Sequence, residues 1–308
     1  MIKNHSNHTL ISIVGPTAIG KTSLAIKLAQ HFNTEIISAD SRQFFRELSI
    51  GTAKPTSEEL TQAKHHFVNN LSIAEDYNAS DFEDEAIDLL SHLFKKHHKV
   101  ILCGGSGMYV DAVTKGFDSQ MPSSDETIRK QLNELFEQEG ITALQNKLLE
   151  LDPVFYHKVD LQNSKRLLRA IEVCLISGKP YSSIRKGEGK KRPFQIIKIG
   201  LEMDRSLLYE RINQRVDQMI KAGLLNEVKS VLKYKDQNAL KTVGYRELFN
   251  YLEGRLTFEE AVEKIKVNSR RYAKRQLTWF KKDAEINWFN PTELTAIVNF
   301  IEEKSNAQ

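Results

Sequence analysis

A phosphate-binding loop is the clearest chemical feature of the sequence, since residues 15 to 22 read GPTAIGKT. Its two glycines, Lys21 and Thr22 fit the pattern G-x-x-x-x-G-K-[ST]. In such a loop the backbone N–H groups surround an anion, the lysine reaches the outer phosphates, and the hydroxyl can bind Mg²⁺. An accidental glycine-rich turn is the alternative, which the apolar stretch before the loop and the helical periodicity after it disfavour. The residues expected to bind phosphate are Gly15, Pro16, Thr17, Ala18, Ile19, Gly20, Lys21 and Thr22.

The sequence lacks the acid with which a nucleotide hydrolase ends a later strand, because the corresponding stretch reads VILCGGSGMY. The best candidate acid is Asp40, at the end of TEIISAD. In a doubly wound sheet the carboxyl ends of adjacent strands face one crevice, so Asp40 should lie beside the phosphate loop. From the residues alone, capping of the following turn is an equally good interpretation. Polar neighbours (Ser41, Arg42 and Gln43) and the loop GTAKP at 51–55 favour a functional site.

The CGGSGMY turn should reach the same edge of the sheet. Its three glycines permit close approach of the backbone, and Ser106 places one hydroxyl there for a phosphate oxygen. A hydroxyl does not replace a magnesium-binding carboxylate. The chemistry therefore favours a phosphate group that is held as a leaving group over one that is attacked by water.

Composition indicates a globular protein of about two domains, with 308 residues, 40% hydrophobic and 27% charged. The polar N-terminus and a five-residue apolar run predict neither a signal peptide nor a membrane span, so we expect a cytoplasmic protein. Cys103 and Cys174 predict buried thiols in a reducing compartment. The histidine pairs 65–66 and 97–98 lack zinc-finger spacing and favour solvated surface residues over a metal site.

The net charge of +4 is unevenly distributed. Residues 1–120 hold 11 Lys+Arg against 14 Asp+Glu, whereas the remainder holds 33 against 26. The basic excess in the C-terminal part favours a polyanion such as nucleic acid as a partner, although a solvated basic surface would also explain it.

The elements that position these residues predict an α/β fold with three regions. Residues 1–120 alternate strands and helices, with one helix opened by a capping box at Ser80-x-x-Glu83, and predict a P-loop core with a doubly wound parallel sheet. Residues 121–193 show only helices and predict an inserted helical domain. Residues 194–308 return with a strand at 194–201 and basic C-terminal helices. These helices are expected to start at Asp204 and at Thr257-x-x-Glu260, and the insertion's first helix at Ser123-x-x-Glu126.

These stretches together resemble the tRNA dimethylallyltransferases, also called tRNA isopentenyltransferases, over about residues 10 to 290. The loop alone is widespread, whereas the DSRQ…GTAKP block and the ordered set are specific to that family. Some eukaryotic members add a C-terminal zinc finger, and this chain stops soon after INWFNP, which suggests the short bacterial form. The similar stretches are GPTAIGKT, ISADSRQFFRELSIGTAKP, CGGSGMY, RLLRAIEV…ISGKP, RINQRVDQMIKAGLLNEV, TVGYREL and RRYAKRQLTWF.

The resemblance implies transfer of the dimethylallyl group from dimethylallyl diphosphate to the exocyclic amine of the adenosine 3′-adjacent to the anticodon, with Mg²⁺ as cofactor. The loop would then hold the donor's diphosphate, and no water-activating acid is required. Asp40 matches the family's general base, Ser106 stands where many members carry Thr, and Arg215 matches an arginine aimed at the diphosphate. These three are the expected catalytic residues, and Thr22 is the expected metal ligand. Without the resemblance, Arg211 and Arg215 at i and i+4 would more commonly be a solvated helix face.

The tRNA anticodon stem-loop is the expected partner, and its target base must be flipped into the pocket. Residues 264–282 contain eight Lys+Arg and no acid, interleaved with Tyr272, Trp279 and Phe280. Tyr272 and Phe280 fit core positions equally well. The expected tRNA-binding residues are Asp40, Ser41, Arg42, Gln43, Ser106, Arg129, Lys165, Arg166, Arg169, Gly244, Tyr245, Arg246, Arg270, Lys274 and Arg275.

Two other functions fit part of the sequence. A P-loop small-molecule kinase would share the loop, the Asp after the second strand and a helical lid with arginines, but the basic aromatic helix argues against it. A non-catalytic P-loop RNA-binding module would share that helix. We expect a monomer that binds no membrane; ATP binding and the set of modified tRNAs stay open.

Overall fold

The computed structural model describes residues 8–117, 121–122, 124–185 and 189–306. The chain forms two compact units. The core unit consists of Met1–Thr114 and Arg192–Gln308, and the helical unit of Lys115–Lys191.

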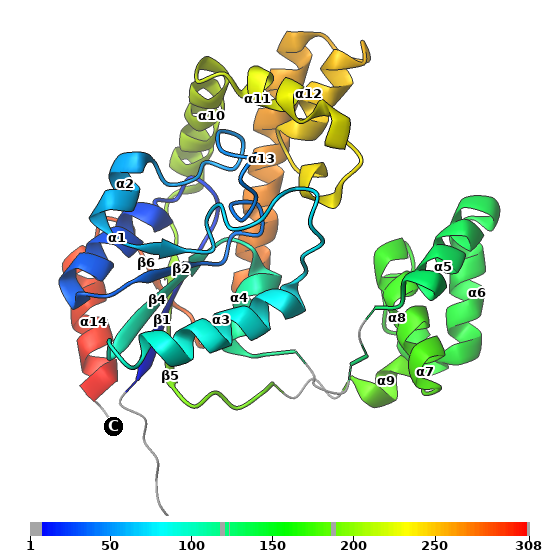
Figure 1. Ribbon diagram of the computed structural model, residues 1–308, viewed down its shortest axis with the longest axis horizontal. Coiled ribbons are helices and arrows are strands. Elements are labelled where there is room, and N and C mark those ends of the chain that lie inside the picture. The colour runs from blue at the N-terminus through cyan, green and yellow to red at the C-terminus, as the bar shows by residue number, and fades with distance from the viewer. Residues whose placement is uncertain (1–7, 118–120, 123, 186–188, 307–308) are drawn as a thin grey trace, which may run out of the picture. The chain divides into compact units, whose positions relative to one another are not determined.

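Within the described residues, the core unit contains one six-stranded sheet with the strand order β3-β2-β4-β1-β5-β6 (Figure 1). Every pair of neighbouring strands is parallel, which confirms the predicted doubly wound sheet. The central strand β1 pairs with β4 from Thr9↔Lys99 to Val14↔Gly104, and with β5 on its other side. The strands are β1 (Thr9–Val14), β2 (Ile36–Ser38), β3 (His65–His66), β4 (Lys99–Gly104), β5 (Gln195–Leu201) and β6 (Asn287–Phe289).

Helices cover both faces of the sheet, and β1 is therefore buried along its whole length. Ile11 and Ile13 pack with residues of α1 (Lys21–Phe32) and α14 (Leu294–Asn306). Leu10 and Val14 pack on the opposite face with α3 (Ala79–Leu93) and α4 (Gly107–Thr114). Between β2 and β3 lies the short helix α2 (Ser57–Gln62).

A further part of the core unit is helical and is held together by α13 (Phe258–Phe280). Ala261 and Ile265 of α13 pack with α10 (Arg205–Lys221), α11 (Leu224–Ser230), α12 (Tyr245–Leu252) and the loop after β2. Farther along α13, Ala273 joins the α1 face of the sheet and Phe280 the α3 face. Two 3₁₀ helices, Leu232–Tyr234 and Asn238–Leu240, connect α11 to α12.

The helical unit, drawn in green in Figure 1, packs around leucines of three helices. Leu132, Leu144, Leu148 and Leu167 are at most 3% exposed. The helices are α5 (Glu126–Glu139), α6 (Ile141–Leu151), α7 (Pro153–Tyr156), α8 (Ser164–Ser177) and α9 (Tyr181–Ile184).

Two of the predicted helix starts differ from the structure. The capping box of α3 is formed by Asn78 and Asp81 and not by Ser80 and Glu83, because the helix begins at Ala79. Asp125 caps α5 by accepting from the Ile128 N–H, and Ser123 lies outside the described residues. The boxes or caps at Thr257 and Asp204 are confirmed.

The prediction that the histidine pairs are solvated is wrong for His65, His66 and His97, which are partly buried, and is confirmed for His98, which is exposed. His65 and His66 form the short edge strand β3. Two residues are too few to give a sequence pattern that predicts a strand. The His66 Nε2 lies 2.6 Å from a carboxylate oxygen of Glu35, and the His97 Nε2 lies 3.5 Å from the other. The two cysteines are free and buried, as predicted.

Candidate active site

The anion loop, residues 15–22, lies between β1 and α1 in the predicted order. Gly15 and Gly20 adopt φ values of +150° and +107°, in the region that favours glycine. A Cβ atom on Gly15 would also come within 2.9 Å of the Leu201 carbonyl oxygen. The backbone can therefore turn tightly beside β5, which directs the loop over the end of the sheet.

Lys21 lies at the first position of α1 and folds back over the anion loop. Its ammonium donates to the carbonyl oxygens of Gly15 (3.0 Å) and Pro16 (2.8 Å). Burial lowers the pKa of Lys21 to about 8, an effect that the nearby Asp40 carboxylate partly opposes. A buried cation without a full counter-charge is a strong site for an incoming anion.

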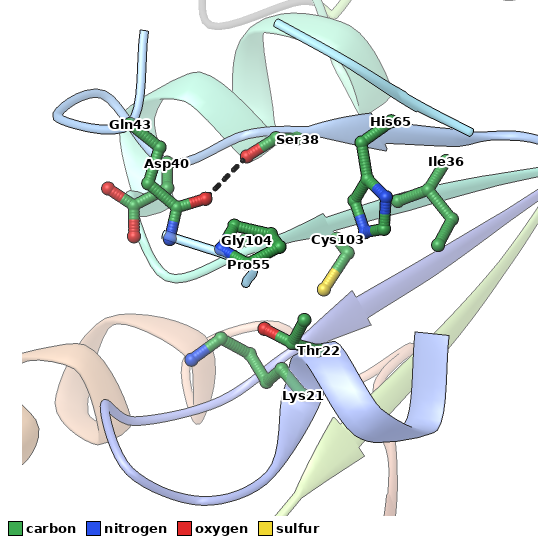
Figure 2. Close-up of a pocket in the computed structure, with 10 residues that line it drawn as sticks. All are labelled: Lys21, Thr22, Ile36, Ser38, Asp40, Gln43, Pro55, His65, Cys103 and Gly104. Carbon is green, nitrogen blue, oxygen red and sulfur yellow. Dashed lines mark hydrogen bonds between the residues drawn. The ribbon is translucent and has the colours of Figure 1, made fainter. Parts of the chain in front are cut away.

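A pocket lies at the carboxyl ends of β2 and β4, beside the anion loop (Figure 2). The structure thus brings Asp40 together with Lys21 and Thr22, as predicted from strand topology. The pocket is lined by Lys21, Thr22, Ile36, Ser38, Asp40, Gln43, Pro55, His65, Cys103 and Gly104.

Both interpretations of Asp40 have a structural counterpart. One carboxylate oxygen accepts from the Arg42 N–H at 3.2 Å and so caps the turn. The same side chain lines the pocket, where its charge acts on both Lys21 and Arg215. Capping therefore orients a carboxylate that also faces the site.

Ser106 connects the turn after β4 to the turn after β2. Its Oγ accepts from the Ser41 N–H at 3.1 Å and lies 3.0 Å from the Ser41 Oγ. Tyr272 of α13 lies next to this pair, and the surrounding protein together with the Asp40 charge raises the pKa of its phenol. The serine side chain is thus held by Ser41 even without the methyl group of a threonine, although Ser106 is not among the residues that line the pocket.

Arg215 and Arg211 of α10 both contact the anion loop, although Arg215 is half-buried there and Arg211 is exposed to solvent. Arg215 donates to the Thr17 Oγ1 at 3.4 Å, and Arg211 to the Ile19 carbonyl oxygen at 3.5 Å. Burial lowers the pKa of the Arg215 guanidinium, while the charge of Asp40 raises it. The loop therefore has cationic groups from α1 and from α10.

Gln43 supports the loop at residues 51–55 through hydrogen bonds and exposes little surface to RNA. Its side chain is 8% exposed. The amide donates to the carbonyl oxygens of Thr52 and Ala53 and accepts from the Ser38 hydroxyl. Its predicted contact with tRNA through the side chain has no support in this geometry.

Tyr245 is also a core residue, with 0% of its surface exposed. Its hydroxyl donates to Glu227 at 2.6 Å, and the same carboxylate accepts from the N–H groups of Ser49, Ile50 and Gly51. The Tyr245 ring is enclosed and supports the GTAKP loop through Glu227, so its side chain offers no surface for the predicted tRNA contact.

Residues flanking Tyr245 differ in their environment. Gly244 is buried and caps α12 with a φ of +97°, whereas Arg246 is exposed. Arg246 therefore keeps a surface that RNA could reach.

The outer side of α13 separates predicted RNA contacts from structural residues. Lys274 and Arg275 are exposed, and Arg275 lies over the Tyr272 ring. Arg270 is instead engaged by Asn213 at 2.6 Å and lies 3.8 Å from Glu263. Tyr272 and Trp279 are 36% and 41% exposed, whereas Phe280 is 2% exposed and belongs to the core.

Sequence reasoning missed Gln276, which contacts both loops of the site. Its Oε1 accepts from the Thr17 N–H at 2.8 Å, and its Nε2 donates to the Gly105 carbonyl oxygen at 2.9 Å. The available signal was its spacing: Gln276 shares a helix face with Ala273 and Phe280, and a polar residue among core positions needs partners.

The predicted cations of the helical unit fall into two pairs. Arg129 and Arg169 each bind Glu172 at 2.8 Å, and this glutamate is 1% exposed. Lys165 and Arg166, in the first turn of α8, are exposed. The first pair therefore neutralises a buried charge, and the second is available to a partner.

No group of three or more His, Cys, Asp or Glu side chains in the described part of the chain could hold a metal. The side-chain oxygens in the pocket belong to the Thr22 and Ser38 hydroxyls, the Asp40 carboxylate and the Gln43 amide, whose oxygen already accepts from Ser38. Such a sparse set fits Mg²⁺, which keeps several waters and binds substrate phosphates.

Among the helices of the described ranges, none is long and apolar enough to cross a membrane.

The comparisons with known proteins all identify the same kind of protein. The family model described as IPP transferase matches residues 43–283. A tRNA dimethylallyltransferase of Christiangramia forsetii is 52% identical over 298 residues, covering 96% of this chain and 98% of the relative. A full-length tRNA isopentenylpyrophosphate transferase structure from Bacillus halodurans has a TM-score of 0.73 at 38% identity and 97% coverage of both chains. A eukaryotic dimethylallyltransferase acting on tRNA has a TM-score of 0.80 at 26% identity, covering 97% of this chain and 78% of that one.

Proposed function

The chain belongs to the IPP transferase family, and on that premise we propose that it transfers a dimethylallyl group from dimethylallyl diphosphate to an adenosine of tRNA. The proposed acceptor is the exocyclic amine of the adenosine 3′-adjacent to the anticodon. The observation that most supports this proposal is a pocket in which one carboxylate, that of Asp40, lies opposite the anion loop with Lys21.

The anion loop would bind the donor's diphosphate. Lys21 and Arg215 would exchange their present contacts with loop oxygens for contacts with the more strongly charged phosphate oxygens. As the allylic carbon–oxygen bond breaks, negative charge develops on the diphosphate, and these cations and the loop amides stabilise it. Mg²⁺, when bound at Thr22, would supply further positive charge to the same oxygens.

Asp40 would act on the nucleophile. The lone pair of an adenine amine is delocalised into the ring, so the nitrogen gains reactivity only as it loses a proton. In the proposed step the nitrogen–carbon bond forms, the carbon–oxygen bond breaks, and one amine proton passes to the Asp40 carboxylate. Ser106 and Ser41 would hold the turns that shape the entrance for the flipped base.

RNA would be held outside the pocket by exposed cations. Those of the core unit are Lys274, Arg275 and Arg246, and those of the helical unit are Lys165 and Arg166. We propose that a monomer is the active form. The small-molecule kinase and the non-catalytic module both lose support, because the similar proteins are tRNA prenyltransferases.

The decisive experiment incubates the protein with dimethylallyl diphosphate, Mg²⁺ and unmodified tRNA. We expect a prenylated adenosine in the anticodon loop by mass spectrometry and little ATP hydrolysis with or without tRNA. RNA binding without a modified base would favour the non-catalytic module, and rapid ATP turnover would favour a kinase or ATPase.

A further inference from the structure

We propose that Gln276 is a positioning residue for the reaction: it fixes the anion loop and the turn after β4 at the separation that the diphosphate requires. The role rests on the proposed function, since it concerns the same donor site. Gln276 touches no reacting atom in this proposal and acts through Thr17 and Gly105.

The two hydrogen bonds of Gln276 join segments far apart in sequence. The Thr17 N–H lies within the anion loop and the Gly105 carbonyl lies in the turn that carries Ser106, and both are bound at 2.8–2.9 Å. The glutamine is 6% exposed, so water cannot readily replace either bond. A Cβ on Gly105 would lie 2.3 Å from the Gln276 Nε2, which shows how closely the turn approaches the amide.

A neutral amide is the group that this place requires. One neighbour is a backbone donor and the other a backbone acceptor, and a glutamine side chain supplies the complementary acceptor and donor without adding charge. A carboxylate could accept from Thr17 but would face the Gly105 carbonyl without a proton between them. It would also lie next to the anion that the loop is proposed to bind.

Thr17 is where this support meets the cationic groups of the site. Gln276 holds its backbone, Arg215 contacts its hydroxyl, and Lys21 holds the carbonyl oxygens of the two preceding residues. Loss of the Gln276 bonds should therefore displace the loop amides and Arg215 together. The same helix carries exposed Lys274 and Arg275 on its outer side, which the substitution leaves in place.

The test compares Gln276→Met and Gln276→Glu with the wild-type protein, using inorganic diphosphate with Mg²⁺ as the probe in calorimetry. Gln276→Met keeps the length of the side chain and removes both hydrogen bonds, and we expect Kd for diphosphate to rise about tenfold or more. Affinity for tRNA should stay within about twofold, because the outer face of α13 is unchanged.

Gln195→Met is the matched control. Gln195 also bridges two groups of the core unit, accepting from the Thr9 hydroxyl and donating to the Lys304 carbonyl. Gln195 is not among the residues that line the pocket. Because Gln195 is only half-buried, this variant should lose less stability than Gln276→Met, and it should bind diphosphate like the wild type.

Gln276→Glu adds a readout that a purely space-filling role would not give. When protonated, the glutamic acid can accept from Thr17 and donate its proton to the Gly105 carbonyl, so both bonds return. The charged or titratable groups of the adjoining site are Lys21, Asp40, Arg42, Cys103, Arg215 and Tyr272, and Lys21 and Gln276 both approach Gly105. These groups are also present in the wild-type protein. The ratio of Kd for diphosphate in Gln276→Glu to Kd in the wild type therefore cancels their titration to first order. This ratio should fall as the pH is lowered from about 8 to about 6.

Unchanged diphosphate affinity of Gln276→Met, or a Gln276→Glu ratio that does not vary with pH, would overturn the role. A wild-type protein that binds no diphosphate would contradict the proposed function itself and this role with it. The two failures are thereby distinguishable.

Discussion

At the scale of single residues, the site consists of opposite charges held apart across a pocket. Asp40 follows β2, whereas Lys21 opens α1 and Arg215 lies on α10. If these groups formed close ion pairs with one another, the site would be neutralised. They are instead held by backbone groups or by the Thr17 hydroxyl, which leaves their charges available to substrates.

Substitution of Asp40 by asparagine should separate chemistry from binding. Asp40→Asn keeps the shape and removes the proton acceptor, so single-turnover transfer should slow by about 10²–10⁴-fold. Affinity for tRNA should change by no more than a few-fold. Near-normal transfer rates would leave Asp40 with the capping role alone, and a large loss of tRNA affinity with intact chemistry would make it a recognition residue.

Lys21 should make donor binding depend on pH. Its pKa of about 8 lies below the ordinary lysine value, so the free protein loses this cation as the pH rises through about 8. A bound anion favours the protonated amine, hence affinity for diphosphate should be highest below this pH and decline above it. Calorimetry on the wild type and on Lys21→Met, compared as a ratio, removes the titration of diphosphate itself. A ratio that is constant between about pH 7 and about pH 9 would contradict the assignment.

At the scale of elements, α13 performs different tasks on its two sides. Ala273, Gln276 and Phe280 face the sheet and the two loops, whereas Lys274 and Arg275 face outward. Because one rigid helix carries both sets, the surface proposed for RNA has a defined position relative to the anion loop. Arg270 belongs to the structural set through its bond to Asn213.

The outward set predicts a change in salt dependence. Reversing Lys274 and Arg275 to glutamate should weaken tRNA binding and reduce the slope of log K against log salt by about two, one for each lost phosphate contact. Lys264→Glu reverses an exposed charge on the same helix and is the control, since it lies outside the predicted contacts. An unchanged slope in the double variant would place the RNA elsewhere.

At the scale of the whole molecule, two units have separate cores. The donor site lies entirely in the core unit, while Lys165 and Arg166 lie in the helical unit. Arg129 and Arg169 should not be used to probe RNA binding, because their removal would leave the buried Glu172 without a cationic partner, at a cost of about 3 kcal/mol in unfolding free energy.

Reversing the charges of Lys165 and Arg166 by substitution with glutamate should therefore affect the binding of tRNA only. We expect weaker tRNA binding with Kd for diphosphate unchanged, as measured by filter binding and calorimetry on the same preparations. Lys130→Glu reverses one exposed charge elsewhere in the helical unit and is the control. Equal effects of the control and the double variant would indicate a general field effect and not a contact.

The sequence by itself determined the strands β1, β2, β4 and β5 with the helices between them, the anion loop and the place of Asp40 at a strand end, but not the short edge strands β3 and β6. These features depend on neighbours in the chain: apolar periodicity, glycines at fixed spacing, and the rule that parallel strands present their carboxyl ends at one edge. The buried thiols and the caps at Asp204 and Thr257 follow from equally local rules.

Only the tertiary structure decided which polar residues of the motifs face the site and which support it. Gln43, Tyr245 and Gln276 carry polar groups that sequence reasoning assigned to RNA or did not single out, yet all three are buried and bind backbone or carboxylate groups. Their partners lie on segments up to 259 residues away, and a local pattern cannot show a partner at that distance. A buried polar group must find such partners, and that requirement, satisfied only once the chain has folded, separates support from contact.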